Sequence, residues 1–512
     1  MPTSYVYSSI ISTVPAHDNS IDSLVGNSRW QISTLTYSFP ASNNALYWSS
    51  LSSGYGSLSG GGEPWQSNFT PLTSADQATF ANALQQWANV ANLNFTRVTE
   101  TPSYVGDIRA AYTWDTDEST LAWTYPPSTS PIAGDIWINL NGVLSSEDWN
   151  PGNISFETIL HEIGHALGLT HPFADPDAPS KPALPKSLDS IIHTVMSYTY
   201  ANLQGEEGSE FSFHPTTPMV FDITAIQFIY GANTHYHADN DTYTFNDANT
   251  YHETLWDAGG NDTIRYDGAI SGLIDLNPGD GSFIGQQVYV QLNGLNVGDP
   301  VPNVWIANKV TIENAVAGQG NDTLIGNSSS NNLDGGAGID TVQVDSLRSQ
   351  FTLKPIPNGY TLTDNTNSGN QDTLTNIERV KFADAHVALD LDGHAGEVAK
   401  LLGAVFGAAA VSNPDFAAIG LIKADEGVSY QQLATLAINA TKLTSHDAIV
   451  SLLWQNLFGS APTLSEKSPY VNMLDSGEIS TGALAVLAAD TGINAENIHL
   501  TGLMQTGLAY SG

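Results

Sequence analysis

The sequence predicts an α+β protein of several domains, and three observations lead to this prediction. A chain of 512 residues, 41% of them apolar, is long enough for two to four packed domains. Its first part alternates like strands and then becomes an amphipathic helix. Its middle part is a repeat rich in glycine and aspartate, and its last part has helical periodicity. The expected segments are an N-terminal arm (1–29), a strand-and-helix domain (30–230), a β-roll with a β-cap (231–394) and a helical domain (395–512).

The charge balance of the chain is strongly acidic. It has 15 Lys and Arg against 52 Asp and Glu, a net charge of −37. Such a surface argues against nucleic acid and anionic membranes as partners, and it fits either solubility or the binding of divalent cations. The absence of cysteine excludes disulfides and thiol catalysis. No stretch approaches the roughly 20 apolar residues of a membrane span, and no basic n-region opens the chain, so we expect neither membrane insertion nor an ordinary signal peptide.

The elements of the first part follow from local patterns. The polar residues 1–29 are expected to form a loosely held arm. Ser74 and Gln77 form a possible capping box, and apolar residues recur after them at helical spacing. Strands are expected after Trp30 and at 95–98, 107–113 and 136–140. Loops are expected at the Ser- and Gly-rich residues 49–62 and the proline-rich residues 172–188.

Three histidines then stand at the spacing of a metal site, in His161-Glu162-x-x-His165-x-x-Gly168-x-x-His171. On a helix, His161 and His165 project from one face, one turn apart, opposite an apolar stripe. Gly168 can end the helix in a left-handed turn that brings His171 back toward them. Three imidazoles leave a zinc ion one open position, which is the arrangement of a catalytic zinc site. Histidines placed on a surface or in a core by chance would not explain the full spacing.

Glu162 adjoins the first histidine and is not expected to bind the metal. It would act as a general base, taking a proton from a water that zinc activates and delivering it to the leaving amine. The alternative interpretation is a solvated helix glutamate.

The middle part repeats with a period of nine residues. Residues 317–324 align with 335–342 at an offset of 18, and Asp322, Asn331 and Asp340 share one position of the unit. This pattern predicts a calcium-binding parallel β-roll, within a β-roll/β-sandwich domain, and the alternative is a glycine-rich hairpin loop. Asn331 offers only a neutral amide oxygen, so its turn should bind calcium more weakly. The expected calcium ligands are Asp257, Gly259, Asp262, Gly318, Gly320, Asp322, Gly336, Gly338 and Asp340.

Together, the histidine motif and the later Val195-Met196-Ser197-Tyr198 resemble the metzincin zinc proteases. The continuation Thr170-His171-Pro172 is similar to the serralysin branch, as are the stretches 223–233, 255–263 and 310–315. The resemblance covers roughly residues 20–345 in family order. The helical tail from 395 departs from it, and Thr199 stands where the resemblance leads us to expect Trp.

The resemblance implies further roles. Tyr198 would ligate the zinc in the resting state and swing away to support the oxyanion, and the alternative is a packed aromatic ring. Met196 would pack beneath the imidazoles. Asp241 would belong to a calcium site at the start of the roll.

We therefore expect a secreted, extracellular zinc endopeptidase that hydrolyses extracellular proteins and needs calcium to fold. A protein or peptide substrate would lie extended between the zinc helix and an edge strand within 121–139. The resemblance also implies export by type I secretion machinery. Two alternatives remain: a non-catalytic calcium-dependent surface or adhesion protein, and a protease that its helical tail attaches to a cell-surface or protein partner.

Overall fold

A computed structural model describes residues 10–49, 54–57, 63–65, 69–115, 117, 119–141, 149–174, 181–201, 208–367 and 370–512. Most of the expected loop 49–62 and residues 175–180 of the proline-rich loop lie outside these ranges. The chain divides into two compact units, each of which draws on two stretches of sequence. The first comprises the residues up to 262 and 277–312, and the second comprises 263–276 and 313–512.

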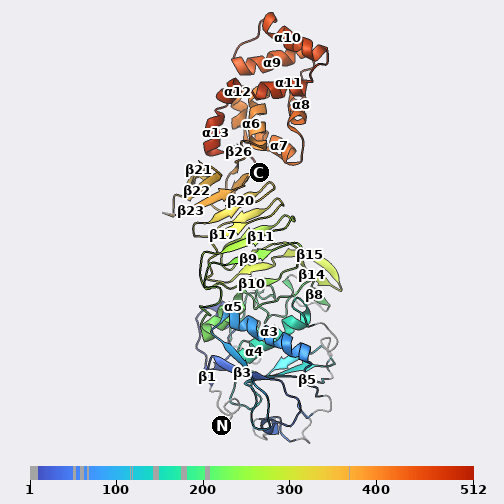
Figure 1. Cartoon of the computed structure of the whole chain (residues 1–512), viewed down its shortest axis with the longest axis vertical. Coiled ribbons are helices and arrows are strands. Elements are labelled where there is room, and N and C mark those ends of the chain that lie inside the picture. Colours follow the sequence, from blue (N-terminus) through green and yellow to red (C-terminus); the bar gives the residue numbers. More distant parts are fainter. Residues whose placement is uncertain are drawn as a thin grey trace. The chain divides into compact units, whose positions relative to one another are not determined.

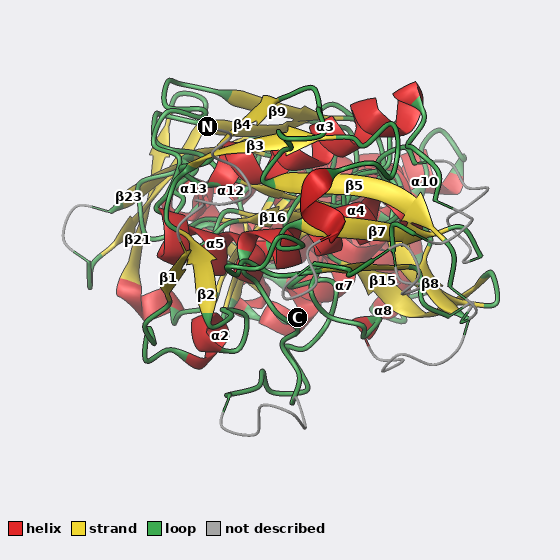
Figure 2. Ribbon diagram, turned by 90° about the horizontal axis from the view of Figure 1, so that it is seen from below, coloured by secondary structure: helices red, strands yellow, loops and turns green. Residues whose placement is uncertain are grey.

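The first unit is built on a five-stranded sheet with the order β4-β3-β5-β7-β6, of which β3 and β5 are labelled in Figure 1. Its strands are β3 (Thr34–Ser38), β4 (Asn94–Arg97), β5 (Ile108–Thr113), β6 (Ala122–Thr124) and β7 (Asp135–Asn139). Four of them are parallel, and β6 runs antiparallel to β7 along one edge. Every residue of β5 and β7, which lie side by side in Figure 2, is buried, as expected of inner parallel strands.

Two helices, α3 (Ser74–Val90) and α4 (Ile154–Leu167), pack against this sheet and against each other. The helix expected at Ser74 is present, but its N-cap is Thr73, which forms the capping box with Asp76 rather than Gln77. Gly168, with φ 106°, ends α4 in the left-handed conformation that the sequence predicts. A third helix, α5 (Val220–Tyr230), is almost wholly buried on its apolar side.

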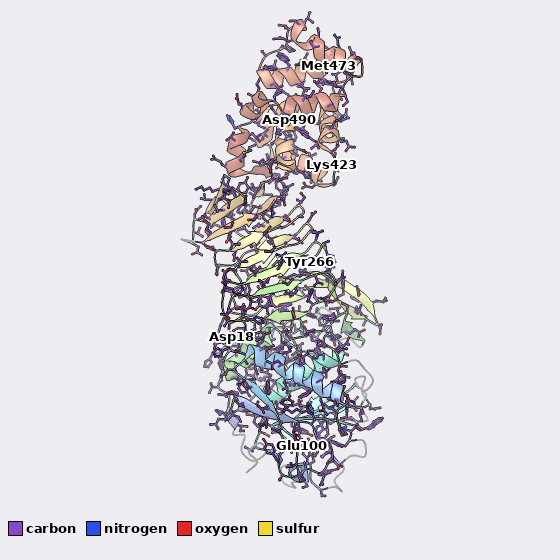
Figure 3. All side chains as sticks on the ribbon, in the orientation of Figure 1. Asp18, Glu100, Tyr266, Lys423, Met473 and Asp490 are labelled. Atoms are coloured by element: carbon purple, nitrogen blue, oxygen red, sulfur yellow. The ribbon has the colours of Figure 1, made fainter. Side chains whose placement is uncertain are left out.

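The described residues of the N-terminal arm are held more firmly than expected. Strand β1 (Ile10–Ser12) pairs antiparallel with β2 (Ser28–Trp30), and between them Asp18, labelled in Figure 3, caps the short helix α2 (Asn19–Asp22). Leu24 is fully buried, and its carbonyl accepts a hydrogen bond from the backbone of Thr170 at 2.8 Å. This part of the arm is therefore docked beside the end of α4.

Smaller sheets complete the first unit. The antiparallel sheet β15-β14-β8 consists of β8 (Ser209–Phe211), β14 (Val288–Leu292) and β15 (Leu295–Val301). The sheet β10-β16-β13 consists of β10 (Glu253–Leu255), β13 (Gly281–Ser282) and β16 (Val304–Ile306). Strand β9 (Thr242–Phe245) begins the region of short strands.

The second unit contains parallel strands that follow the predicted repeat. Leu324 in one sheet aligns with Val342, 18 residues later, while Ala315 aligns with Leu333 in the other sheet. One strand therefore adds to each sheet per 18 residues, and the apolar residue of every nine-residue unit is buried between the sheets. One sheet holds β12 (Leu273–Asp275), β18 (Thr323–Ile325), β20 (Thr341–Val344), β24 (Arg379–Phe382), β25 (His386–Ala388) and β26 (Leu508–Tyr510). The other holds β11 (Thr263–Tyr266), β17 (Asn314–Val316), β19 (Asn332–Asp334), β23 (Gln371–Thr375), β22 (Gly359–Asp364) and β21 (Phe351–Ile356).

The helices of the second unit share a core with the end of the roll. They are α6 (His394–Leu401), α7 (Pro414–Asp425), α8 (Tyr430–Ala440), α9 (His446–Phe458), α10 (Leu464–Asp475), α11 (Thr481–Ala489), α12 (Gly492–Asn497) and α13 (Leu500–Thr506). Their apolar core also includes Ala388, Leu391 and Leu508. After the last helix, β26 returns to pair with β25. The buried guanidinium of Arg379 on β24 binds Asp425 on α7 through two hydrogen bonds of 2.8 and 2.9 Å.

These elements confirm the prediction of an α+β multidomain fold with a parallel β-roll and a C-terminal helical region. In the part of the chain that the structure describes, no helix is both long and apolar enough to cross a membrane.

Candidate metal centre and active site

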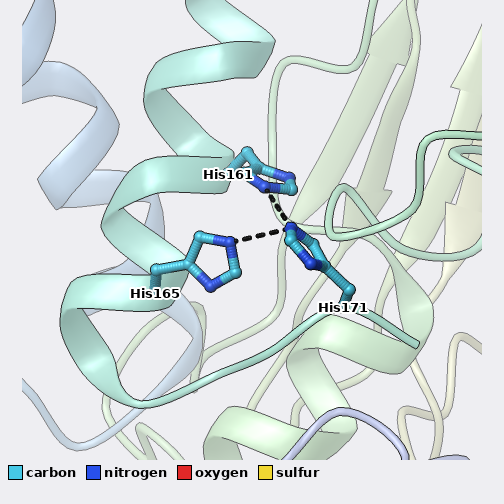
Figure 4. A group of neighbouring side chains, drawn as sticks. All are labelled: His161, His165 and His171. Carbon is cyan, nitrogen blue, oxygen red and sulfur yellow. Dashed lines mark hydrogen bonds between the residues drawn. The ribbon is translucent and has the colours of Figure 1, made fainter. Parts of the chain in front are cut away.

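Helix α4 and the turn after it bring the three predicted zinc ligands together (Figure 4). The Nε2 atom of His171 lies 3.1 Å from Nε2 of His165 and 3.3 Å from Nε2 of His161. His161 and His165 are one turn apart on α4, and the reversal at Gly168 places the third ring against them. The three rings converge as the spacing predicts.

Backbone carbonyls fix the orientation of two of these rings. Nδ1 of His161 lies 2.7 Å from the carbonyl of Val195, and Nδ1 of His165 lies 2.9 Å from the carbonyl of Leu169. Because a carbonyl oxygen can only accept, each Nδ1 carries the proton and each Nε2 keeps its lone pair for the shared point. Burial lowers the pKa of His165 to about 4, and burial with the neighbouring rings holds the pKa of His161 well below its usual value.

This donor set fits a zinc ion. Zinc–nitrogen bonds of about 2.0–2.1 Å in a tetrahedral arrangement separate two ligand nitrogens by roughly 3.3 Å, close to the separations seen here. Neutral imidazoles with their lone pairs converging on one point are the form in which histidine binds metal. His161, His165 and His171 are therefore suited to hold zinc.

Tyr198 also lies beside the three histidines and lines the cleft next to them. Its hydroxyl lies 2.7 Å from Nε2 of His171, and its ring stacks on His161 with a centroid distance of 5.5 Å. The side chain is 57% exposed, so it borders open space and can turn without disrupting a core. Burial of the hydroxyl and the carboxylate of Glu162 raise the pKa of Tyr198 to about 12.

The carboxylate of Glu162 is buried beside the histidines and is held by Thr124. The Thr124 hydroxyl donates to Oε2 of Glu162 at 2.6 Å. Burial raises the pKa of Glu162 to about 7, and the Thr124 hydrogen bond opposes this shift. Thr124 lies on β6, the edge strand of the sheet, and α4 packs beside that strand. The sequence signals did not single out Thr124, because its partner lies 38 residues away.

The segment 194–197 forms the floor under the histidines. Met196 is fully buried and packs so closely on α4 that a Cβ at Gly164 would lie 2.5 Å from its sulfur. Asp222 on α5 holds this segment by accepting hydrogen bonds from the Thr194 hydroxyl at 2.6 Å and the Val195 nitrogen at 2.8 Å. The sequence patterns did not single out Asp222 either. The one signal that could have identified it is its position in the first turn of an apolar helix.

In the first unit, three of the predicted calcium ligands meet. Asp241, Asp257 and Asp262 each have one carboxylate oxygen that lies within 4.8 Å of the corresponding oxygens of the other two. Oδ1 of Asp262 accepts the backbone N–H of Asp241 at 2.7 Å, and Oδ1 of Asp257 accepts that of Gly259 at 2.6 Å. Three carboxylates at this separation repel one another unless a cation lies between them, which fits a calcium ion.

In the second unit, the predicted ligands form a ladder of carboxylates along the roll. Oδ1 of Asp340 accepts the backbone N–H of Asp322 at 2.7 Å, and Oε2 of Glu378 accepts that of Asp340 at 2.8 Å. Burial and the carboxylates of Glu378, Asp322 and Asp334 raise the pKa of Asp340 to about 7. Glu378 extends this ladder beyond the nine-residue repeat, so the repeat gave no signal for it.

Four of the five glycines among the predicted calcium ligands lie where neighbouring backbone segments touch, whereas nothing lies within 4 Å of a Cβ placed at Gly259. A Cβ at Gly336, where φ is 84°, would lie 2.2 Å from the carbonyl oxygen of Gly318. A Cβ at Gly338, where φ is 147°, would lie 2.0 Å from the carbonyl oxygen of Gly320. Both positions therefore require glycine, and these backbone carbonyls stay close to the next turn.

Comparisons with known proteins agree with this arrangement. The model of the matrixin family matches residues 67–179, and the model of the serralysin C-terminal domain of M10 peptidases matches residues 221–400. A protein named serralysin from Photorhabdus laumondii is 34% identical over 292 residues, which is 53% of this chain and 57% of that protein. Serralysin B from Dickeya chrysanthemi is 36% identical over 281 residues, which is 50% of this chain and 54% of that protein. The chain thus spans a little over half the length of these relatives.

The two matched regions cover different parts of the molecule. The matrixin match includes α4 with its histidines, and the serralysin match runs from α5 through the roll into α6. Both follow one another in the order expected from the zinc motif and the calcium repeat. Over these two regions the chain is therefore similar to the serralysin-type metzincins.

Proposed function

We propose that the protein is a secreted zinc endopeptidase whose fold depends on calcium. Two observations carry this proposal: three Nε2 atoms converge on one point, and His161 and Glu162 line one cleft beside an edge strand. Zinc held by His161, His165 and His171 would supply a Lewis acid that lowers the pKa of a water to about 7.

The side chains of the chain itself would move the protons. Glu162, oriented by Thr124, would accept a proton at its carboxylate from the attacking water and then release it to the leaving amine. Its raised pKa brings the carboxylate close to the pH at which such a transfer is efficient. Tyr198 would donate a hydrogen bond from its hydroxyl to the oxyanion as the carbonyl is attacked.

The edge strand would position the substrate. β6 pairs with β7 on one side, and its other edge offers backbone N–H and C=O groups to an extended peptide. A peptide added there would lie along the cleft that Glu162 and Tyr198 line. This mode of binding favours unfolded or flexible segments of protein substrates.

The calcium-dependent part of the proposal rests on the crowded carboxylates. Asp241, Asp257 and Asp262 would hold one ion, and Asp322 and Asp340 with the carbonyls near Gly318 and Gly320 would hold others. Extracellular calcium would then complete folding after export by a type I system, for which the long calcium-repeat region is suited.

Digestion of a denatured protein by the full-length chain, with zinc and calcium present, tests the peptidase proposal. Glu162→Ala should retain zinc and lose at least about 99% of the activity, since it removes the general base. Glu478→Ala, at an exposed carboxylate of the helical region, is the matched control and should digest like wild type. A Glu162→Ala protein that binds zinc and digests at the wild-type rate would overturn the mechanism.

The alternative of a non-catalytic adhesion protein predicts no digestion by the wild type. It also leaves the hydrogen bond from Thr124 to Glu162 without a role, because a surface protein has no need for an oriented base. A protease tethered by its helical region stays compatible with all of these observations, and deletion of that region would separate attachment from digestion.

A further inference from the structure

The cavity that contains His161 and Glu162 extends along α4 to a second carboxylate. Its volume is about 410 Å³, and it is bordered by the first turns of α4, the residues that lead into β6 and the segment around Tyr198. Pockets of about 300–1,000 Å³ are typical of ligand sites. There is therefore room for a substrate side chain beside the residues proposed to act on the peptide bond.

Glu157 supplies this second carboxylate. It lies one helical turn before His161, so both side chains project from the same face of α4. Glu157 is only 6% exposed, yet it lines the cavity. Its Oε2 atom lies 2.5 Å from Nδ1 of His214, and among the described residues His214 is its hydrogen-bond partner. Oε1 accepts no hydrogen bond from the described residues, so it can accept one from a ligand.

His214 fixes the orientation of this carboxylate. The histidine is 3% exposed, its backbone N–H donates to the carbonyl of Gly152 at 2.8 Å, and its ring contacts Tyr200 and Phe211. A group held in place before a ligand arrives loses little entropy on binding, which favours selectivity.

The charge that protein side chains bring to the cavity is negative. Its described lining residues include two carboxylates, Glu157 and Glu162, and no lysine or arginine. Burial and the carboxylates of Glu157 and Glu210 hold the pKa of Tyr200, on the cavity wall, above its usual value. An acidic substrate side chain would be repelled here, and a cationic one would be attracted. The alternative is that Glu157 and His214 form a pair that only stabilises the fold. We would expect such a pair to be fully enclosed, whereas Glu157 borders the cleft.

We propose that Glu157 is a specificity-determining residue that makes the cleft select substrates with a lysine or arginine beside the scissile bond. This inference rests on the proposed peptidase function. Neighbours one helical turn apart are separated by about 5–6 Å, a distance that either long side chain spans from the zinc ligands. His214 already bonds Oε2 of Glu157, so a cationic side chain has Oε1 as its first partner, and both lysine and arginine can donate to it.

The test begins with the wild-type, full-length protein loaded with zinc and calcium. Mass spectrometry of a digested denatured protein gives the residues on either side of each cut, and one fixed position should be enriched in lysine and arginine. Peptides that differ only at this position, with Arg, Lys, Gln or Glu, then give values of kcat/KM. The Arg and Lys peptides should exceed the Gln peptide about tenfold, as expected for a charged hydrogen bond, and the Glu peptide should be poorest.

Two variants test the residue. In Glu157→Gln the Arg-to-Gln ratio of kcat/KM should fall to about one, while in Glu210→Gln, which lies outside the cavity lining, the ratio should stay at its wild-type value. Digestion without a basic preference, or an unchanged ratio in Glu157→Gln, overturns the inference. Because the first experiment changes only the substrate, it decides the matter even if Glu157→Gln does not fold.

Peptide binding separates this inference from the peptidase proposal. Affinities of the Arg and Gln peptides are measured on Glu162→Ala, which should bind without cutting. If wild type digests nothing but the Arg peptide still binds about tenfold more tightly, the selectivity stands and the peptidase proposal falls. Equal affinities for both peptides count against the selectivity alone.

Discussion

A carboxylate oxygen of Asp222 lies 2.8 Å from the backbone nitrogen of Val195, whose carbonyl in turn accepts the Nδ1 proton of His161 at 2.7 Å. One residue of α5 thus sets the direction of an imidazole on α4 through the segment between them. Loss of such a supporting contact typically costs about 10- to 100-fold in metal affinity. Asp222→Asn should therefore weaken zinc binding by at least about tenfold, as measured by competition with a chelator. Asp280→Asn, at an exposed carboxylate of the same unit, is the control, and equal zinc affinities in both would contradict this role.

The hydrogen bond from Thr124 to Glu162 should matter for turnover more than for metal binding. Thr124→Val keeps the shape of the side chain and removes the donor, so Glu162 loses its fixed orientation. We expect kcat to fall about tenfold, as when a charged hydrogen bond is lost, with zinc content unchanged. Thr124→Ser retains the hydroxyl and should recover most of the rate. A Val variant as fast as the Ser variant would show that this contact is dispensable.

Close packing between Gly164 and Met196 should make the floor of the site sensitive to one methyl group. Alanine at position 164 would place its Cβ 2.5 Å from the Met196 sulfur and 3.3 Å from the Trp87 ring. Overpacking of this kind costs about 1–3 kcal/mol, so Gly164→Ala should lower the thermal midpoint of the first unit in calorimetry. Gly492→Ala is the control, because nothing lies within 4 Å of the added atom. It should not lower the thermal midpoint of the second unit, to which Gly492 belongs. An unshifted midpoint in Gly164→Ala would mean that Met196 can move aside freely.

Removal of calcium should unfold the roll at neutral pH, because the ladder of carboxylates then has no counter-charge. Circular dichroism during a calcium titration measures the calcium concentration at which the roll forms. Asp340→Asn removes a fully buried carboxylate from the ladder, and we expect the midpoint to rise about tenfold. Asp345→Asn, at an exposed position nearby, should not move it. A roll that is complete in chelator would refute the dependence on calcium.

The buried imidazole of His252 should make the first unit labile to acid. Its Nδ1 donates to the carbonyl of Phe213 at 2.9 Å, and Nε2 is buried without a hydrogen-bond partner among the described residues. Burial lowers the pKa of His252 from 6.5 to about 4. The unfolded chain therefore binds the proton more readily, so stability is fully present above pH 6.5 and is lost as the pH falls from there to about 4, by up to about 3 kcal/mol.

The variant His252→Asn keeps a donor for the Phe213 carbonyl and removes the titrating group. Ten of the eleven tryptophans belong to the first unit, so tryptophan fluorescence follows its unfolding. Between pH 7 and pH 5 in saturating calcium, the wild type should lose more stability than the variant. Parallel losses would assign the acid lability to other groups.

The sequence was most informative where function follows from local spacing. The zinc helix, its end at Gly168 and the 18-residue register of the roll all depend on contacts between close neighbours in the sequence or on a repeat. Thr124, Asp222 and His214 act on residues 27 to 57 positions away, and no periodicity connects such partners. The N-cap differs by one residue because Thr73 and Ser74 are both good caps, and the acid at position 76 decided between them. The arm is docked because burial of the Leu24 side chain stabilises its contact with the rest of the unit, although most residues around Leu24 in the sequence are polar.

The adjacent residues Glu378 and Arg379 determine where the helical region could be cut if it were grafted onto another protein. One residue accepts a hydrogen bond from the carboxylate ladder of the roll, and the next binds Asp425 of the helices. A graft that starts at residue 395 would leave behind Arg379, together with Ala388 and Leu391 of the shared core. A transferable module therefore has to begin upstream of β24 and carry the last strands of the roll with it.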